Sequence, residues 1–387
     1  MPGYELIGKQ EKEEVEKIFK NGGVLFRLGF EKLRKNKFKV LEFEKKFANY
    51  MNSKYALAVT SGTAALRVAL AALRLKPGDE VITQSFTFVA TVEAIIEAKL
   101  KPVCCDIDNT LNLDPLSLKK KITKKTKAVI LVHMLGVSGH IEKIKKICDK
   151  KNIPIIEDTA WGCGGYYGKK RLGTIGRMGT FSFDYAKSMT TGEGGMILFN
   201  KKSDWMKASA WHDHGHENNP KKPRWEDTRD RSGFNFRMTE LQAAVGLAQL
   251  KKLKKVISIH RKNMKKIKKK LMKLNLEFRK VPEKNSETAD ALMFMVKNKN
   301  IAKKCRRELN KNGVQTKILP EASTWHFAKY WRHIPEIIKK TKIKKNYFKK
   351  SSFYLDRTIS IPVNIKMKKK IPNLIFSSLS KVIKQND

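Results

Sequence analysis

Short apolar runs alternate with amphipathic stretches along the first half of the chain. The runs of strand length lie at residues 55–59, 80–83, 102–107, 127–133, 153–157, 180–183 and 196–199. Such alternation is typical of a mostly parallel sheet with helices on both faces. Farther along, residues 239–274 repeat apolar positions at helical spacing, which predicts one long helix. The pattern therefore predicts an α/β protein.

One lysine stands between an apolar run and a glycine-rich segment. Lys187 follows Phe181, Phe183 and Tyr185 and precedes the segment TTGEGG. A lysine becomes a nucleophile when burial or neighbouring positive charge lowers its pKa, and the hydroxyl groups around Lys187 suit a phosphate. This arrangement favours an aldehyde cofactor that carries a phosphate. In a chain with 82 Lys and Arg, the alternative is a solvated surface lysine.

Three further segments support the cofactor hypothesis. Asp158 ends an apolar strand, where a parallel sheet presents residues to the ligand crevice, and a carboxylate there can pair with a pyridine nitrogen. Gly62 and Thr63 follow another strand and open a helix, an arrangement that suits a phosphate. Phe88 follows a third strand, where its ring can stack on a heteroaromatic cofactor. The alternatives are ordinary helix caps for the first two segments and core packing for Phe88.

In their order along the chain, these segments resemble the sugar aminotransferase family of fold-type I pyridoxal-phosphate enzymes. The match runs from about Gly3 to the end of the chain and is dense between Lys54 and Leu250. The segments that carry it are SGTAAL, GDEVIT, SFTFVAT, TKAVILVHMLG, IIEDTA, GTFSF, TTGEGGM and GFNFRMTELQAAVGLAQL.

This resemblance implies the α/β fold type I of pyridoxal-phosphate-dependent transferases. That fold has a large domain with a mostly parallel seven-stranded sheet and a smaller C-terminal α+β domain. Together with a change in composition, the resemblance places the large cofactor-binding domain and its N-terminal arm at residues 1–250. The small domain is placed at residues 251–387.

The resemblance also implies a role for each residue of the cofactor site. Lys187 is expected to form the Schiff base with pyridoxal 5′-phosphate, Asp158 to bind the pyridine nitrogen and Phe88 to stack on the ring. The residues expected to hold the phosphate are Gly62, Thr63 and Ser182, with Asn235 from the neighbouring subunit. A homodimer with shared active sites is therefore implied.

One position departs from the family. The family usually has a glutamine three residues after the aspartate, where it contacts the ring oxygen of the cofactor, but this sequence has Trp161. Indole donates a hydrogen bond and cannot accept one. Either Trp161 donates to that oxygen, or a neighbour such as Thr159 replaces the contact.

The resemblance further implies a transaminase that moves an amino group from an amino acid, typically L-glutamate, to a keto or aldehyde sugar. Lys187 argues against the dehydratase branch, which has histidine at this position. Several segments look closer to the branch that makes 8-amino-3,8-dideoxy-manno-octulosonate for lipopolysaccharide from an 8-aldehyde. They are MPGYELIG, GVLFRLGF, FSFDYAK and WHDHGHENNPKKPRWED. The alternative acceptors are nucleotide-linked keto-deoxyhexoses, which most of the family aminates.

A sugar-acid substrate needs cationic or hydrogen-bonding partners. The candidates are His212, His214, His216, Arg229 and Arg231. The resemblance separately implies a substrate-facing histidine at His326. A His-x-His-x-His run can also bind a metal, but no cysteine or carboxylate cluster at metal spacing accompanies it. We therefore expect no metal. For His326, packing beside Trp325 is the alternative.

The charge of the chain raises a rival function. The net charge is +45, and residues 251–350 hold 32 Lys and Arg against seven Asp and Glu. A basic domain can bind nucleic acid, but these lysines follow the polar faces of helical patterns without a nucleic-acid-binding motif. We therefore expect no specific nucleic-acid partner. A second rival is a family member that lost catalysis and became a binding or regulatory protein, which the presence of Lys187 and Asp158 disfavours.

Cysteine usage and hydropathy indicate the cellular compartment in which we expect the protein. The five cysteines are odd in number and form no Cys-x-x-Cys pair, which indicates reduced thiols. The first residues lack the apolar core of a signal peptide, and no apolar run is long enough to span a bilayer. The sequence therefore predicts a cytoplasmic enzyme without a membrane partner.

Overall fold

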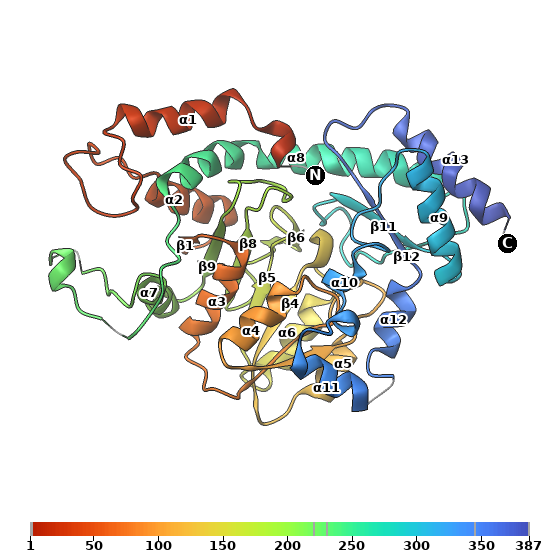
Figure 1. Cartoon of the computed structure of the whole chain (residues 1–387), viewed down its shortest axis with the longest axis horizontal. Coiled ribbons are helices and arrows are strands. Elements are labelled where there is room, and N and C mark those ends of the chain that lie inside the picture. The colour runs from red at the N-terminus through yellow and green to blue at the C-terminus, as the bar shows by residue number, and fades with distance from the viewer. Residues whose placement is uncertain (1–2, 220, 230, 344–345, 386–387) are drawn as a thin grey trace.

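A seven-stranded sheet forms the centre of the larger part of the molecule (Figure 1). The computed structural model describes residues 3–219, 221–229, 231–343 and 346–385. Neighbouring strands are parallel except beside β9, which pairs antiparallel with β1 and β8. The predicted mostly parallel seven-stranded sheet is therefore confirmed. In spatial order the strands are β1 (Tyr55–Val59), β9 (Gly195–Phe199), β8 (Met178–Ser182), β5 (Ile155–Asp158), β4 (Thr126–Val132), β2 (Glu80–Gln84) and β3 (Lys101–Cys105).

Helices cover both faces of this sheet because its strands are apolar on both sides. In β4, Ile130 belongs to the core cluster on one face, whereas Val129 and Leu131 belong to a cluster on the other. The helices of the first face are α3 (Gly62–Ala72), α4 (Ala90–Glu97) and α7 (Lys202–Trp211). Those of the second face are α2 (Lys39–Met51), α5 (Pro115–Lys121), α6 (Ile141–Asp149) and the first part of α8 (Glu240–Leu271). The result is a three-layer α/β/α arrangement.

Close backbone packing brings the end of β1 to the start of β9. A side chain at Gly195 would place its Cβ 2.3 Å from the carbonyl oxygen of Ser61, and one at Gly62 would place it 2.7 Å from Cβ of Ser182. Only glycine fits such close approaches. The start of α3 therefore lies against the end of β8.

A smaller antiparallel sheet forms the second part of the molecule (Figure 1, right). Its core joins this sheet to α9, α13 and the last turns of α8. The strands are β10 (Glu277–Phe278), β11 (Ala291–Met295) and β12 (Thr358–Pro362), and the helices are α9 (Lys299–Lys311) and α13 (Ile371–Lys384). This composition matches the α+β character predicted for the C-terminal region.

The long helix α8 joins the two parts. The sequence predicts a helix over residues 239–274, and the observed helix begins at Glu240, where Thr239 and Gln242 form a reciprocal capping box. Leu253 and Ile257 pack in the core of the large part, whereas Met264 and Ile267 pack in that of the small part. The predicted domain boundary at residue 250 thus falls inside a continuous helix.

A segment of the C-terminal region returns to the large sheet. Phe327, Trp331 and Phe348 pack in the same core cluster as β4 and α3. The elements of this segment are α10 (Ser323–His326), η4 (Ala328–Tyr330), α11 (Pro335–Ile343) and α12 (Lys349–Leu355). Phe327 also pairs with Phe86, so residues far apart in the sequence meet where β2 ends.

The N-terminal arm lies along α8. It contains η1 (Tyr4–Leu6) and α1 (Lys9–Lys20), and Glu11 of α1 accepts hydrogen bonds from Lys252 and Gln249 of α8. The remaining short elements are β6 (Tyr166–Tyr167), β7 (Lys170–Arg171), η2 (Met134–Gly136) and η3 (Arg224–Glu226). Within the described residues, we find no helix whose length and hydropathy suit a bilayer crossing.

Candidate active site

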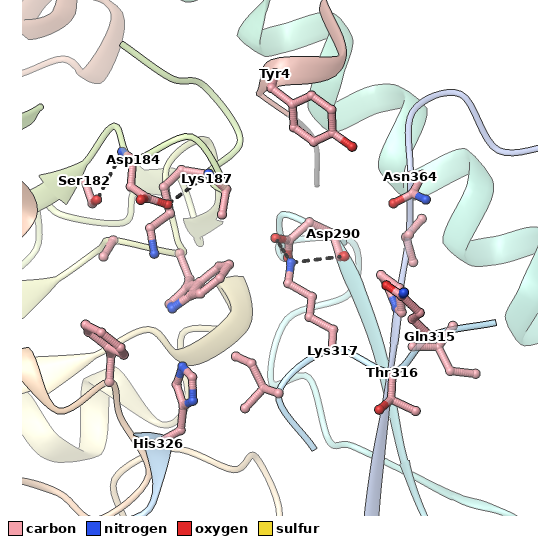
Figure 2. A pocket seen from close by; sticks show the side chains of 18 of the residues that line it. Tyr4, Ser182, Asp184, Lys187, Asp290, Gln315, Thr316, Lys317, His326 and Asn364 are labelled. Carbon is pink, nitrogen blue, oxygen red and sulfur yellow. Dashed lines mark hydrogen bonds and ion pairs between the residues drawn. The ribbon is translucent and has the colours of Figure 1, made fainter. Parts of the chain in front are cut away.

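Lys187 lines a cavity between the two parts of the chain (Figure 2). It lies in the loop between β8 and β9, where its backbone N–H donates to Asp184 O at 3.0 Å and its carbonyl accepts the N–H of Gly3 at 2.8 Å. Burial lowers the pKa of Lys187 to about 8, with a smaller contribution from Lys317, while Asp184 and Asp158 oppose the shift. Part of this amine is therefore neutral near neutral pH, the state that a nucleophile requires.

Asp158 lines the same cavity from the end of β5. Its Oδ2 accepts the hydroxyl of Thr91 at 2.9 Å and its Oδ1 accepts the N–H of Ala160 at 3.2 Å. Burial raises the pKa of this carboxyl, and these two hydrogen bonds and the charge of Lys187 oppose the rise. No helix begins at Asp158, because residues 160–163 form turns, so the helix-cap alternative is not supported.

The start of α3 faces the cavity with Ser61, Gly62 and Thr63. Ser61 Oγ caps the helix by accepting the N–H of Ala64 at 3.0 Å. Ser182, at the end of β8, lines the cavity beside them. Backbone N–H groups at a helix N-terminus together with hydroxyl groups form a site suited to a phosphate. Three of the four predicted phosphate ligands therefore lie together.

Phe88 and His326 meet at the cavity wall. Their ring centroids are 5.4 Å apart, and Phe88 is 39% exposed, so its ring is available for stacking. His326 Nδ1 lies 2.9 Å from the carbonyl oxygen of Ala322. Burial lowers the pKa of His326 to about 4, so this imidazole is neutral at neutral pH. Trp325 is 64% exposed, whereas His326 is buried at 7% exposure.

Trp161 lies under two amino groups. Lys187 Nζ is 3.6 Å from the centroid of the Trp161 ring and Lys317 Nζ is 4.7 Å from it, both within the range of cation–π contacts. The carbonyl of Trp161 accepts the hydroxyl of Thr288 at 3.3 Å. The residue that departs from the family pattern thus contacts Lys187 and the side of the cavity near the small sheet.

The structure adds cavity residues that the sequence did not reveal. Figure 2 shows Tyr4 from the N-terminal arm together with residues from the C-terminal region. Those from the C-terminal region include Asp290, Gln315, Thr316, Lys317 and Asn364. Tyr4 lies in the opening segment MPGYELIG, whereas no motif marks the residues of the C-terminal region, and Lys317 is one of 82 basic residues. Only the return of these segments to the large sheet places them here.

The remaining predicted residues lie outside this cavity. They are His212, His214, His216, Arg229, Arg231 and Asn235, none of which lines it. They belong to the segment that follows α7, which extends away from the sheet at the left of Figure 1. Within one chain, these six residues are therefore not part of the cavity wall.

The histidines of this segment have partners of their own. His212 Nδ1 lies 2.5 Å from Ser209 O, and burial lowers the pKa of His212 to about 3. His216 Nδ1 lies 3.3 Å from Asp227 Oδ2, and His214 is exposed. Among the residues that the structure describes, no group of three His, Cys, Asp or Glu side chains is placed to hold a metal ion.

The cavity residues fit pyridoxal phosphate. They offer an amine of lowered pKa for its aldehyde, a carboxylate for its pyridine nitrogen and a helix N-terminus for its phosphate. The cavity volume is about 1120 Å³, above the range of about 300–1,000 Å³ usual for one small ligand. A substrate therefore has room beside the cofactor. The fold and this site define a fold type I pyridoxal-phosphate enzyme.

Comparisons with known proteins agree with this class. The chain matches the DegT/DnrJ/EryC1/StrS aminotransferase family over residues 7–379. It is 40% identical to a GDP-perosamine synthase of Caulobacter vibrioides over 55% of this chain. It is 32% identical to an uncharacterized protein of Methanocaldococcus jannaschii over 90% of this chain and 91% of that protein. An aminotransferase structure from Psychrobacter cryohalolentis superposes with a TM-score of 0.84 at 26% identity, covering 98% of each chain.

The chain therefore belongs to the DegT/DnrJ/EryC1/StrS aminotransferase family. Its match to the Caulobacter enzyme spans 57% of that protein's length. Family membership agrees with the resemblance drawn from the sequence motifs. The finer resemblance, to the octulosonate transaminases, has no counterpart among the relatives described above.

Proposed function

We propose that the protein is a pyridoxal-phosphate-dependent aminotransferase that moves an amino group from an amino acid, L-glutamate, to the carbonyl of a nucleotide-linked keto-deoxyhexose. The observation that carries this proposal is the placement of Lys187 and Asp158 in one cavity, with the pKa of the lysine lowered to about 8. The similarity to the Caulobacter GDP-perosamine synthase supports the choice of acceptor.

The roles of the residues follow from their chemistry. When bound, pyridoxal phosphate supplies an electron sink that allows a C–H bond beside the substrate nitrogen to break. Lys187 Nζ, neutral in part at neutral pH, takes that proton and returns it at another carbon. Asp158 keeps the pyridine nitrogen protonated, while Ser61–Thr63 and Ser182 hold the phosphate.

A sugar acid is a second candidate acceptor, namely the 8-aldehyde that gives 8-amino-3,8-dideoxy-manno-octulosonate for lipopolysaccharide. The observation that favours it concerns the opening segment, whose sequence resembles that branch. Gly3 donates to the carbonyl of Lys187, and Tyr4 lines the cavity. The segment that carries the resemblance is therefore part of the site wall.

A homodimer with shared sites completes the proposal. Asn235 is exposed and lies outside the cavity of its own chain, as expected of a residue that serves a neighbouring subunit. Large apolar side chains are exposed near it, with Trp225 at 84% and Phe234 at 55%. Exposed apolar clusters of this kind mark contact surfaces. A second copy of the chain would cover them.

The visible spectrum tests the first half of the reaction. The protein is purified with pyridoxal phosphate, and its spectrum is recorded before and after addition of L-glutamate, with Lys187→Ala as the control. We expect L-glutamate to convert the aldehyde-form band to the amine-form band in the wild type only. An unchanged wild-type spectrum with every common amino acid would exclude the aminotransferase proposal.

The acceptor is then identified with the amine-loaded enzyme. A nucleotide-linked 4-keto-6-deoxyhexose and the 8-aldehyde of 3-deoxy-manno-octulosonate are offered in parallel, and products are detected by mass spectrometry. Return of the aldehyde-form band with only the nucleotide sugar supports the first acceptor. Return of that band with only the sugar acid supports the second acceptor in place of the first.

A further inference from the structure

A buried ion pair forms the wall of the cavity on the side of the small sheet. Lys317 Nζ lies 2.5 Å from Asp290 Oδ2 and 3.5 Å from the carbonyl oxygen of Asp290. The side chains are only 8% and 1% exposed, and both residues line the cavity (Figure 2). Lysine is seldom buried in this way. Solvation at the surface therefore does not explain why this ion pair is present.

Asp290 does not use all of the hydrogen-bonding capacity of Lys317. An ammonium has three N–H donors; the hydrogen bonds described for Lys317 Nζ both go to Asp290, and its contact with the Trp161 ring is a cation–π contact. The carboxylate offsets the cost of burying the cation. At least one donor is left for a ligand in the cavity.

Backbone contacts hold this pair in place. The N–H of Lys317 donates to Ser360 O of β12 at 2.7 Å, and the N–H of Val363 donates to Asp290 O at 3.0 Å. Asp290 directly precedes β11, which pairs with β12 along its whole length. The loop that carries Lys317 is thus hydrogen-bonded to a paired sheet, and little ordering is left for a ligand to impose.

The pair lies close to the reactive amine. Lys187 and Lys317 enter Figure 2 from opposite sides, and their nitrogens lie 3.6 Å and 4.7 Å from the centroid of the same Trp161 ring. The two nitrogens are therefore no farther apart than the sum of these distances. A substrate that reacts at the position of Lys187 can reach Lys317 with a group a few bonds away.

We propose that Lys317 binds the carboxylate of a substrate and that Asp290 is its positioning residue. This inference rests on the proposed function and specifies which substrate group its site recognises. Lys317 and Asp290 together form a neutral ion pair. A bound carboxylate adds one negative charge to this buried site, whereas a phosphate dianion adds two. The smaller charge that must be buried therefore favours a carboxylate over a phosphate at this position.

Two substrates of the proposed reaction offer such a group. One is the amino donor, and the other is a sugar acid as acceptor. A nucleotide-linked hexose has no carboxylate on its sugar. Lys317 therefore either orients the amino donor or selects a sugar acid as the acceptor. Binding of unreactive ligands distinguishes these two roles.

The test is isothermal titration of the pyridoxal-phosphate-loaded enzyme with glutarate, 3-deoxy-manno-octulosonate and UDP-glucose. We expect Lys317→Met to raise the Kd of at least one carboxylate ligand about tenfold or more, the loss usual for a charge-assisted hydrogen bond. Lys317→Arg keeps the charge and is expected to retain binding. The Kd of UDP-glucose should not change. Weaker binding of glutarate would assign the amino donor's carboxylate to Lys317, and weaker binding of the octulosonate would assign the acceptor's carboxylate.

Several outcomes would overturn the proposal. They are carboxylate affinities that Lys317→Met leaves unchanged, an equal loss for UDP-glucose, and a wild-type enzyme that binds neither carboxylate. If Lys317→Met leaves Asp290 as a lone buried charge and does not fold, the variant that combines it with Asp290→Asn removes both charges, and the same pattern is expected. These Kd values do not require turnover, so a wild type inert toward amino acids contradicts the proposed function and leaves this test intact.

Discussion

The properties of single residues explain why this cavity can do chemistry at all. Lys187 has a lowered pKa because it is buried, with Lys317 adding to the effect. Asp158 is buried as well, and Thr91 compensates part of the cost with a 2.9 Å hydrogen bond to its Oδ2. The protonation of Lys187 and Asp158 thus depends on the neighbours that surround them.

The pKa of Lys187 predicts how the apo-enzyme captures pyridoxal phosphate. Neutral amine attacks the aldehyde, so the capture rate should rise with pH through about 8 and then level off. A lysine of ordinary pKa, about 10.4, would give a rate that keeps rising to about pH 10. Stopped-flow absorbance between pH 6 and pH 10 measures it. A continuous rise to the end of that range would contradict the burial effect.

The hydrogen bond from Thr91 predicts a smaller change. Thr91→Val removes the donor from Asp158 while keeping the shape of the side chain. We expect the affinity for pyridoxal phosphate to fall about tenfold or more, the effect of one hydrogen bond to a charged group. Equilibrium dialysis of the apo-variant measures this. Thr63→Val, which changes the phosphate end of the site, serves as a comparison. If Thr91→Val and the wild type bind pyridoxal phosphate with equal affinity, Thr91 does not support Asp158.

At the scale of elements, the site depends on how a helix start meets a strand end. The N-terminus of α3 and the end of β8 touch because Gly62 and Gly195 have no side chains. Parallel pairing of β5 with β8 then sets Asp158 and Ser182 at the same edge of the sheet. The phosphate end and the pyridine end of the cofactor site are therefore fixed by strand pairing.

Substitution of Gly62 tests this contact. Gly62→Ala places a methyl group 2.7 Å from Cβ of Ser182, so one backbone must move. We expect the free energy of unfolding to fall by about 1–3 kcal/mol, as for overpacking elsewhere, with weaker binding of pyridoxal phosphate. Urea unfolding of the apo-protein measures the first effect.

Gly8→Ala is the matched control, since nothing lies within 4 Å of a Cβ at that position. Its free energy of unfolding should stay within about 0.5 kcal/mol of wild type, as for most surface changes. Equal stability of Gly62→Ala and Gly8→Ala would show that the contact between α3 and β8 is not tight.

At the scale of the whole molecule, the cavity exists because two parts of the chain are held against each other. Arg279, beside the small sheet, donates from Nε to Thr110 O at 2.6 Å and from Nη2 to Met134 O, in η2, at 2.7 Å. Both acceptors belong to the large part. Burial lowers the pKa of Arg279 to about 9. This buried link holds Lys317 and Asp290 opposite Lys187.

The proposed shared site predicts complementation between two inactive variants. If Asn235 serves the neighbouring subunit, Lys187→Ala and Asn235→Ala damage different chains of the same site. Refolding a mixture of the two should restore up to about a quarter of wild-type activity, because half of the dimers are mixed and each has one intact site. A rate assay after subunit exchange measures this. Lys187→Ala mixed with Asp158→Ala, which damage the same chain, should restore none.

The sequence alone was sufficient to predict the candidate site residues that lie at the ends of strands. Lys187, Asp158, Gly62 and Phe88 each occupy a short segment after an apolar run, and a parallel sheet brings the ends of such runs to one edge. The seven strands and the long helix α8 follow from the period of apolar positions. These features depend on local pattern, which the chain shows directly.

Only the tertiary structure decided which distant segments complete the wall of the cavity. Tyr4, Asp290 and Lys317 come from an N-terminal arm and from loops that return to the large sheet, and no periodicity records where a loop returns. The same holds for His212 and Asn235, which the structure places outside the cavity of their own chain. The physical reason is that packing between elements far apart in the chain depends on their three-dimensional shapes, whereas the sequence pattern reports only which face of each element is buried.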